Sequence, residues 1–101
     1  MAQQYIFTDA NELVLLLKGK GGRESHVINS ADIRRISFDT APKKLLFFPV
    51  GSTRRIVIIV KTLGTVEFYE SKHKEYFETY LDLLRAFCKE NRVTFYDFAN
   101  A

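Results

Sequence analysis

The sequence contains few of the residues that proteins use for cross-links, metal binding and acid–base catalysis. It has one cysteine, two histidines and no tryptophan among 101 residues. A single cysteine, Cys88, excludes an internal disulfide and a zinc site built from cysteines. His26 and His73 lie far apart, without an HxxxH or HExxH spacing, so we expect no metal ion and no cofactor. Neither histidine belongs to a recognisable nucleophile motif, and we therefore expect a protein that is not an enzyme.

Long hydrophobic runs are also absent. No apolar run approaches the roughly 18–20 residues that a membrane-spanning helix needs, so we expect no transmembrane segment. The segment Met1–Tyr5 lacks the basic and apolar regions of a secretory leader, and we expect a cytoplasmic location. The length fits one domain over residues 1–101. A content of 47% hydrophobic and 27% charged residues is typical of a globular chain.

The longest patterned stretch runs from Ser71 to Asn91 and is predicted to be a helix. Its apolar residues recur at spacings of one, three and four, which forms a single wide stripe. The stripe consists of Tyr76, Phe77, Tyr80, Leu81, Leu84, Phe87 and Cys88. Ser71 fits an N-cap because its hydroxyl can accept a hydrogen bond from the first turn. Asn91 fits the left-handed position after the last turn. The position of Cys88 on the stripe favours a buried, unreactive thiol.

Short β-prone segments separated by turn residues fill the rest of the chain. The predicted strands are Gln4–Thr8, Glu12–Lys18, Glu24–Asn29, Ile33–Asp39, Lys44–Val50, Arg54–Lys61, Thr65–Glu70 and, after the helix, Val93–Phe98. Thr40-Ala41-Pro42 and Gly51-Ser52 are expected to separate neighbouring strands. Connections of hairpin length require antiparallel pairing. The predicted fold class is therefore α+β or mostly β.

This order of elements resembles the pleckstrin-homology (PH) superfold, and most of all the short bacterial PH-like domains. The resemblance is carried by Ile33–Phe38 (IRRISF), the hairpin Ile56–Phe68 and the helix Ser71–Glu90, and it covers roughly residues 4–91. It implies an antiparallel meander barrel of six or seven strands capped by one C-terminal amphipathic helix, with a short final strand. The helix residues facing inward would be Phe77, Leu81, Leu84 and Cys88. Two features depart from the pattern: the helix lacks the tryptophan usual in eukaryotic PH domains, and Val93–Phe98 lies outside the usual PH core.

The loop from Lys18 to Arg23 (KGKGGR) is the first candidate site. Three cations beside glycines can hold a phosphate group. In phosphoinositide-binding PH domains, which this loop resembles, the basic cluster continues into the next strand, whereas here that strand begins Glu24-Ser25-His26. A solvated hairpin tip is the alternative interpretation. The candidate anion-binding residues are Lys18, Lys20, Arg23, Arg54 and Arg55, and their partner would be an anionic lipid or a nucleic acid.

Basic pairs elsewhere give a weaker indication of such a surface. On a strand, adjacent residues point to opposite faces, so the pairs Arg34-Arg35, Lys43-Lys44 and Arg54-Arg55 would each be divided between two surfaces. We therefore favour ordinary surface charge over a nucleic-acid patch.

Three predicted strands are apolar on both faces: Glu12–Lys18, Lys44–Val50 and Arg54–Lys61. A barrel interior buries one face, and large exposed apolar patches usually mark interaction surfaces. Alternatively, Val93–Phe98 and Tyr5–Phe7 fold back over the second faces. The candidate interface residues are Val14, Leu16, Leu46, Phe48, Val57, Ile59 and Phe95. We favour a non-enzymatic binding or scaffolding module that contacts a protein partner and forms a homodimer, with an anion-binding module as the alternative.

Overall fold

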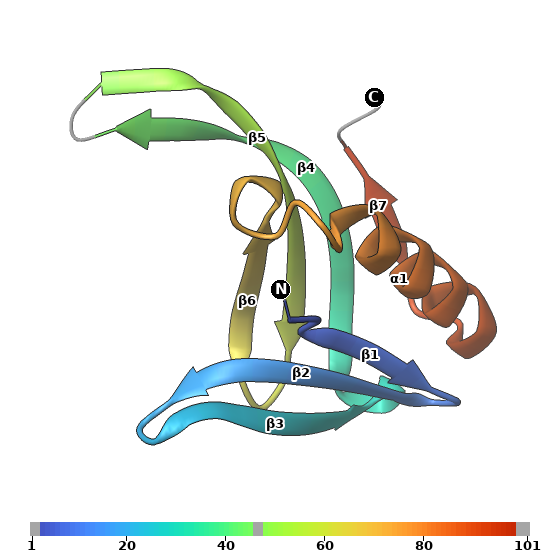
Figure 1. The fold of residues 1–101 in the computed structure, drawn as a ribbon. Coiled ribbons are helices and arrows are strands. Elements are labelled where there is room, and N and C mark those ends of the chain that lie inside the picture. Colours follow the sequence, from blue (N-terminus) through green and yellow to red (C-terminus); the bar gives the residue numbers. More distant parts are fainter. Residues whose placement is uncertain (1–2, 46–47, 99–101) are drawn as a thin grey trace.

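The computed structural model describes residues 3–45 and 48–98, and for residues 43–45 and 48–50 it describes the backbone alone. Over these residues the fold is mostly β, with seven strands in two sheets and one α-helix (Figure 1). The strands are β1 (Ile6–Asp9), β2 (Glu12–Gly19), β3 (Gly22–Asn29), β4 (Ile33–Leu45), β5 (Phe48–Val60), β6 (Gly64–Tyr69) and β7 (Phe95–Asp97). The helix α1 spans Phe77–Asn91, and two short 3₁₀ turns are η1 (Ser30–Asp32) and η2 (Glu70–Lys72).

The two sheets remain separate, so the closed barrel implied by the PH resemblance is wrong. The first sheet has the order β1-β2-β3 and the second has the order β6-β5-β4-β7. All neighbours pair antiparallel except β7, which lies parallel to β4 along residues 36–38. Closure of a meander would require β3 to pair with β4, but β7 occupies that edge of β4. Seven strands were expected before the helix and one after it; the described residues contain six before α1 and one after it.

The segment from β4 to β5 forms one long hairpin, where the sequence indicated three strands. The expected breaks at Thr40-Ala41-Pro42 and at Gly51-Ser52 are wrong, because Pro42 pairs with Ser52 inside the ladder. A register shift between Pro42 and Lys44 accommodates the missing N–H of proline. Gly51 has φ +107°, a conformation that side chains with a Cβ rarely adopt. Proline and glycine therefore mark distortions of a continuous hairpin, whose far end projects from the body in Figure 1.

The helix begins at Phe77, six residues later than Ser71, so the predicted N-cap is wrong. Ser71 lies in η2, where its backbone N–H donates to Thr53 Oγ1 over 3.1 Å. An ion pair between Arg54 and Glu70 holds the same turn against β5. Side-chain contacts to β5 thus replace the first helical turns that the periodicity predicted. At the other end, Arg92 and not Asn91 takes the left-handed conformation, with φ +57° and ψ +34°.

One hydrophobic core is shared by both sheets and α1. Its members are Ile6, Leu13, Leu15, Ile28, Ile33, Ile36, Phe38, Ile56, Ile58, Val60, Phe68, Phe77, Tyr80, Leu81, Leu84, Phe87 and Cys88. The four helix residues expected to face inward all belong to it. Cys88 is buried, as predicted, and burial raises the pKa of its thiol to about 11.

The Tyr80 side chain connects this core to the start of the first sheet. Tyr80 is fully buried, and its hydroxyl accepts a hydrogen bond from the backbone N–H of Tyr5 over 2.8 Å. The carbonyl of Tyr5 accepts from the N–H of Leu16 over 2.9 Å, so the segment before β1 is held from both sides. This contact fixes where β1 begins.

We predict that Tyr80→Phe lowers the free energy of unfolding by about 1–2 kcal/mol, because it leaves the Tyr5 N–H without its partner. Urea unfolding measures the change. The matched control is Tyr69→Phe, which removes a hydroxyl bonded to Glu67 on the exposed face of the second sheet. The control should cost less than about 0.5 kcal/mol. Equal losses in both variants would contradict this role for Tyr80.

Candidate functional site

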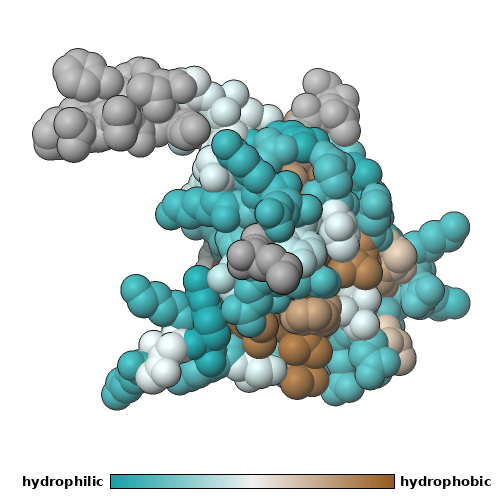
Figure 2. Space-filling model, viewed as in Figure 1, coloured by the Kyte–Doolittle hydropathy of each residue, from teal (hydrophilic) through white to brown (hydrophobic). Residues whose placement is uncertain are grey.

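An apolar patch lies on the outer face of the first sheet. Strand register places Phe7 opposite Val14 and Val14 opposite Val27, so these three side chains form one row across the sheet. Leu16 adjoins the row on the same face, and we call these four residues the apolar patch. Phe7 is 40% exposed and Val27 is 59% exposed, while Val14 and Leu16 are half-buried. Figure 2 shows hydrophobic surface over β1 and β2, framed by hydrophilic surface.

Opposite charges flank the apolar patch along the strands. At one end Asp9 pairs with Glu12, and both side chains are exposed. At the other end Lys18 pairs with Arg23, also exposed. The first sheet therefore presents an acidic end, an apolar middle and a basic end.

The outer face of the second sheet is more polar. Two of the predicted interface residues, Val57 and Ile59, lie on this face and are half-buried. Val57 lies between Ser37 and Glu67 in the register, and Ile59 lies opposite Arg35. Polar neighbours on the flanking strands thus divide the apolar surface of this sheet.

Arg55 is bound by carboxylates on both neighbouring strands. Its guanidinium donates to both oxygens of Asp39 over 2.9 and 2.6 Å, and to Glu67 over 2.9 Å. The Tyr69 hydroxyl donates to the same Glu67 over 2.9 Å. The bond to Asp39 raises the pKa of Arg55 above its ordinary value. The donors of Arg55 are thus engaged within the chain, which leaves little capacity for an external anion.

Arg54 points to the other side of β5 and is also paired. Its guanidinium forms ion pairs with Glu70 and Glu78, and it lies 5.3 Å from the centroid of the Phe77 ring. These hydrogen bonds raise the pKa of Arg54, and the bond to Arg54 lowers the pKa of Glu70. Arg54 thus connects β5 with η2 and the first turn of α1.

The basic hairpin between β2 and β3 is separate from these two arginines. Lys18 and Lys20 are exposed, and Gly22 has φ +119°, which favours glycine in this turn. The guanidinium of Arg23 lies over the Tyr5 ring, 4.4 Å from its centroid. In Figure 1 this hairpin and the projecting β4–β5 arm lie at opposite ends of the molecule. Within the described residues, the structure thus divides the five candidate cations into Arg54 and Arg55, which have carboxylate partners, and the hairpin residues, which have none.

The remaining interface candidates lie in different surroundings. Leu46 is outside the described residues, and the side chain of Phe48 is not described. Phe95 is half-buried and packs against the core, so it does not contribute to an outer face. Neither β1 nor β7 folds back over a second face, because each extends its sheet at an edge.

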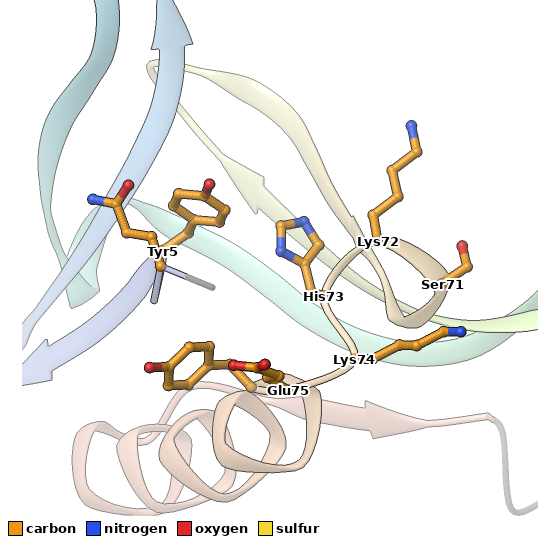
Figure 3. Close-up of a pocket in the computed structure, with 8 residues that line it drawn as sticks. Tyr5, Ser71, Lys72, His73, Lys74 and Glu75 are labelled. Carbon is orange, nitrogen blue, oxygen red and sulfur yellow. The ribbon is translucent and has the colours of Figure 1, made fainter. Parts of the chain in front are cut away.

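A pocket that the sequence did not indicate lies between the start of β1 and the segment 71–76 (Figure 3). His73 reaches into it, with its ring edge-on to Tyr5 at a centroid distance of 5.3 Å. Burial is the main cause of a lowered His73 pKa, and the positive charges of Arg23 and Lys72 lower it further. The aromatic residues of segment 71–76 could have indicated this pocket in the sequence. Their helical spacing instead led to their assignment to the predicted helix.

Metal and membrane sites find no support in the described part of the chain. Residues 3–45 and 48–98 contain no group of three His, Cys, Asp or Glu side chains placed to hold a metal ion. The helices described there are too short or too polar to span a bilayer.

We predict that His73 titrates below about 6.5, the ordinary value for histidine. The unfolded chain then takes up this proton first on acidification, so the free energy of unfolding falls as pH drops below about 6.5. Arg23→Gln should raise the His73 pKa by removing a nearby positive charge. The pH dependence of the imidazole resonances, followed by NMR, measures the His73 pKa in the unaltered chain and in Arg23→Gln. Lys89→Gln, at the far end of α1, is the control. A His73 pKa at or above 6.5 in the unaltered chain would refute the prediction.

Comparison with known proteins gives no further identification. No protein-family model, curated protein or solved structure matches this chain. The resemblance to PH-like domains therefore stays a prediction from the pattern of strands and helix.

Proposed function

We propose that the chain is a non-enzymatic binding module that forms a homodimer through the apolar patch. The observation that carries this proposal is the cross-strand row of Phe7, Val14 and Val27 on an open sheet face. Exposed apolar rows of this kind mark interaction surfaces more often than isolated apolar residues do. Neither terminal strand covers the face within the chain. The cytoplasmic location and the PH-like character stay predictions from the sequence.

The charges beside the apolar patch fit a second copy of the same face. A two-fold axis that runs across the strands at the level of Leu15 makes the β2 strands of two copies antiparallel. Val14 of one copy then lies opposite Leu16 of the other, and Glu12 lies opposite Lys18. The acidic end of each face meets the basic end of its partner. A symmetric contact of this kind is self-complementary in both hydrophobicity and charge.

The expected affinity is modest because the patch is small. Full burial of one Val, Leu or Phe side chain stabilises by about 1.5–3 kcal/mol, and these side chains are already partly buried. Association also costs about 4–15 kcal/mol in translational and rotational freedom. A dissociation constant in the roughly micromolar range is consistent with these terms. The dimer should therefore depend on protein concentration.

We predict that Val27→Lys weakens the dimer at least about tenfold, because it places a charge in the apolar contact. Sedimentation equilibrium over a concentration series measures the dissociation constant. The matched control is Thr65→Lys, which adds the same charge at an exposed position on the outer face of the second sheet. A chain that stays monomeric at every concentration, or equal weakening by the control, would overturn the proposal.

A charge exchange tests the orientation of the two copies. Glu12→Lys alone and Lys18→Glu alone should each weaken association, because each places like charges opposite one another. The double variant Glu12→Lys/Lys18→Glu restores opposite charges and should recover most of the affinity. Added salt should reduce these differences, since both residues are exposed. Additive losses in the double variant would contradict the antiparallel arrangement.

A further inference from the structure

The pocket beside His73 has the volume of a small-molecule site. It has a volume of about 520 Å³, within the usual range for ligand pockets. The residues that line it are Gln3, Tyr5, Ser71, Lys72, His73, Lys74, Glu75 and Tyr76. They come from two segments far apart in the sequence, the residues just before β1 and the connection from β6 to α1 (Figure 3). Residues from two elements can therefore contact one bound molecule.

Packing on several sides fixes the His73 ring while leaving its nitrogen atoms accessible. The ring lies edge-on to Tyr5, Phe68 and Tyr80, with centroid distances of 5.3, 5.4 and 6.0 Å. The two ring nitrogen atoms of His73 have no hydrogen-bond partner among the described residues. Both nitrogen atoms remain accessible to solvent. In Figure 3 the imidazole points across the pocket toward Tyr5. This geometry offers a hydrogen-bonding edge held in place by aromatic walls.

The charges around the pocket are mainly positive. Arg23 lies over Tyr5, and within the described residues it has no carboxylate partner, unlike Arg54 and Arg55. Lys72 and Lys74 extend from the rim, away from His73 in Figure 3. Glu75 is the one acidic residue among those that line the pocket. Among the lining residues, two lysines against one carboxylate give the site an excess of positive charge, and Arg23 beside Tyr5 adds to it.

Two further observations agree with a positive potential inside the pocket. The positive charges of Arg23 and Lys72 contribute to the lowered pKa of His73. The helix α1 begins at Phe77, directly after the lining residues, so the positive end of its dipole lies beside the pocket. The effect of these two side-chain charges and the effect of the helix dipole are each small, but both make the electrostatic potential in the pocket more positive. An anion placed here would meet a favourable field before making any direct contact.

We infer that this pocket binds a small organic anion, with its phosphate or carboxylate group beside Arg23 and His73 and its apolar part against the tyrosine rings. The arginine supplies planar donors suited to an oxyanion. The aromatic walls supply the contact area that an inorganic ion would not use. Phenyl phosphate combines both features and is the probe of choice. Inorganic phosphate provides the comparison that lacks the ring.

The test is an NMR titration of the full chain with phenyl phosphate and, separately, with inorganic phosphate. Phenyl phosphate should bind several-fold more tightly than inorganic phosphate, because only it contacts the aromatic walls. Resonances of Tyr5, His73 and Tyr76 should shift together, and the bound anion should raise the His73 pKa. The titration is repeated in Val27→Lys, so that the result does not depend on the dimer.

Variants with opposite expected effects make the test specific. Arg23→Gln should weaken phenyl phosphate binding roughly five- to tenfold, because it removes the guanidinium beside the Tyr5 ring. Glu75→Gln should strengthen it roughly two- to fivefold, because it removes a repulsive charge. Lys89→Gln removes one positive charge at the far end of α1 and should change binding less than about twofold. All three positions are exposed, so the fold should be retained.

Two outcomes would overturn the inference. The first is equal weakening by Arg23→Gln and Lys89→Gln, which would show a response to net charge alone. The second is binding to anionic phospholipid vesicles with no binding of phenyl phosphate in solution, which would show a charged surface and not a pocket.

Discussion

The guanidinium group of Arg54 joins β5, η2 and the first turn of α1, and the helix begins within this network. Arg54 extends from β5 to Glu70 in η2 and to Glu78 in the first turn of α1. It also lies over the rings of Phe38 and Phe77, so one side chain closes the core at this end. Because η2 is held against β5, residues 73–76 must connect a 3₁₀ turn to a helix. Their irregular path forms one wall of the pocket.

The topology leaves one sheet face open because each terminal strand extends a sheet at its edge. β1 pairs with β2, and β7 pairs with β4. Neither can cover the outer face of its own sheet, which would require a third layer. On the second sheet, the network of Asp39, Arg55 and Glu67 satisfies polar groups across three strands. On the outer face of the first sheet, apolar side chains take the place of such a network, and Phe7 and Val27 are exposed there.

Most of the fold could be predicted from local patterns, while the errors arose from contacts between distant segments. Alternation and turn residues predicted seven strands before the helix where the fold has six, and helical periodicity located the start of α1 to within two turns. The sequence could not show that Pro42 is tolerated inside β4 by a register shift, or that β5 continues through Gly51 at a positive φ. Closure into a barrel was inferred from resemblance, and strand order alone does not decide it. β7 occupies the edge of β4 that closure would need.

The candidate sites show the same limitation more strongly. The sequence analysis placed Arg54 and Arg55 in one candidate site with Lys18, Lys20 and Arg23. A sequence shows which residues are charged, but it does not show which of them form ion pairs in the fold. In the fold, acidic residues 12 to 24 positions away along the chain engage both arginines of β5. No local signal links Arg54 to Glu78. The apolar patch was easier to predict, because Val14 and Leu16 alternate with core residues on a single strand. Its extension to Phe7 and Val27 required the register of three strands.

The proposed dimer face and the proposed anion pocket depend on one short segment. The Tyr5 N–H binds the Tyr80 hydroxyl and the Tyr5 carbonyl binds β2, which places its ring beside His73. Two residues further on, the same segment presents Phe7 on the outer face. A substitution at Tyr5 would therefore disturb both surfaces and could not distinguish them. Val27 lies on a different strand from this segment, and Glu75 lies after β6, so each changes one surface while leaving the shared anchor in place. The two functions can thus be separated only at positions that do not touch Tyr80.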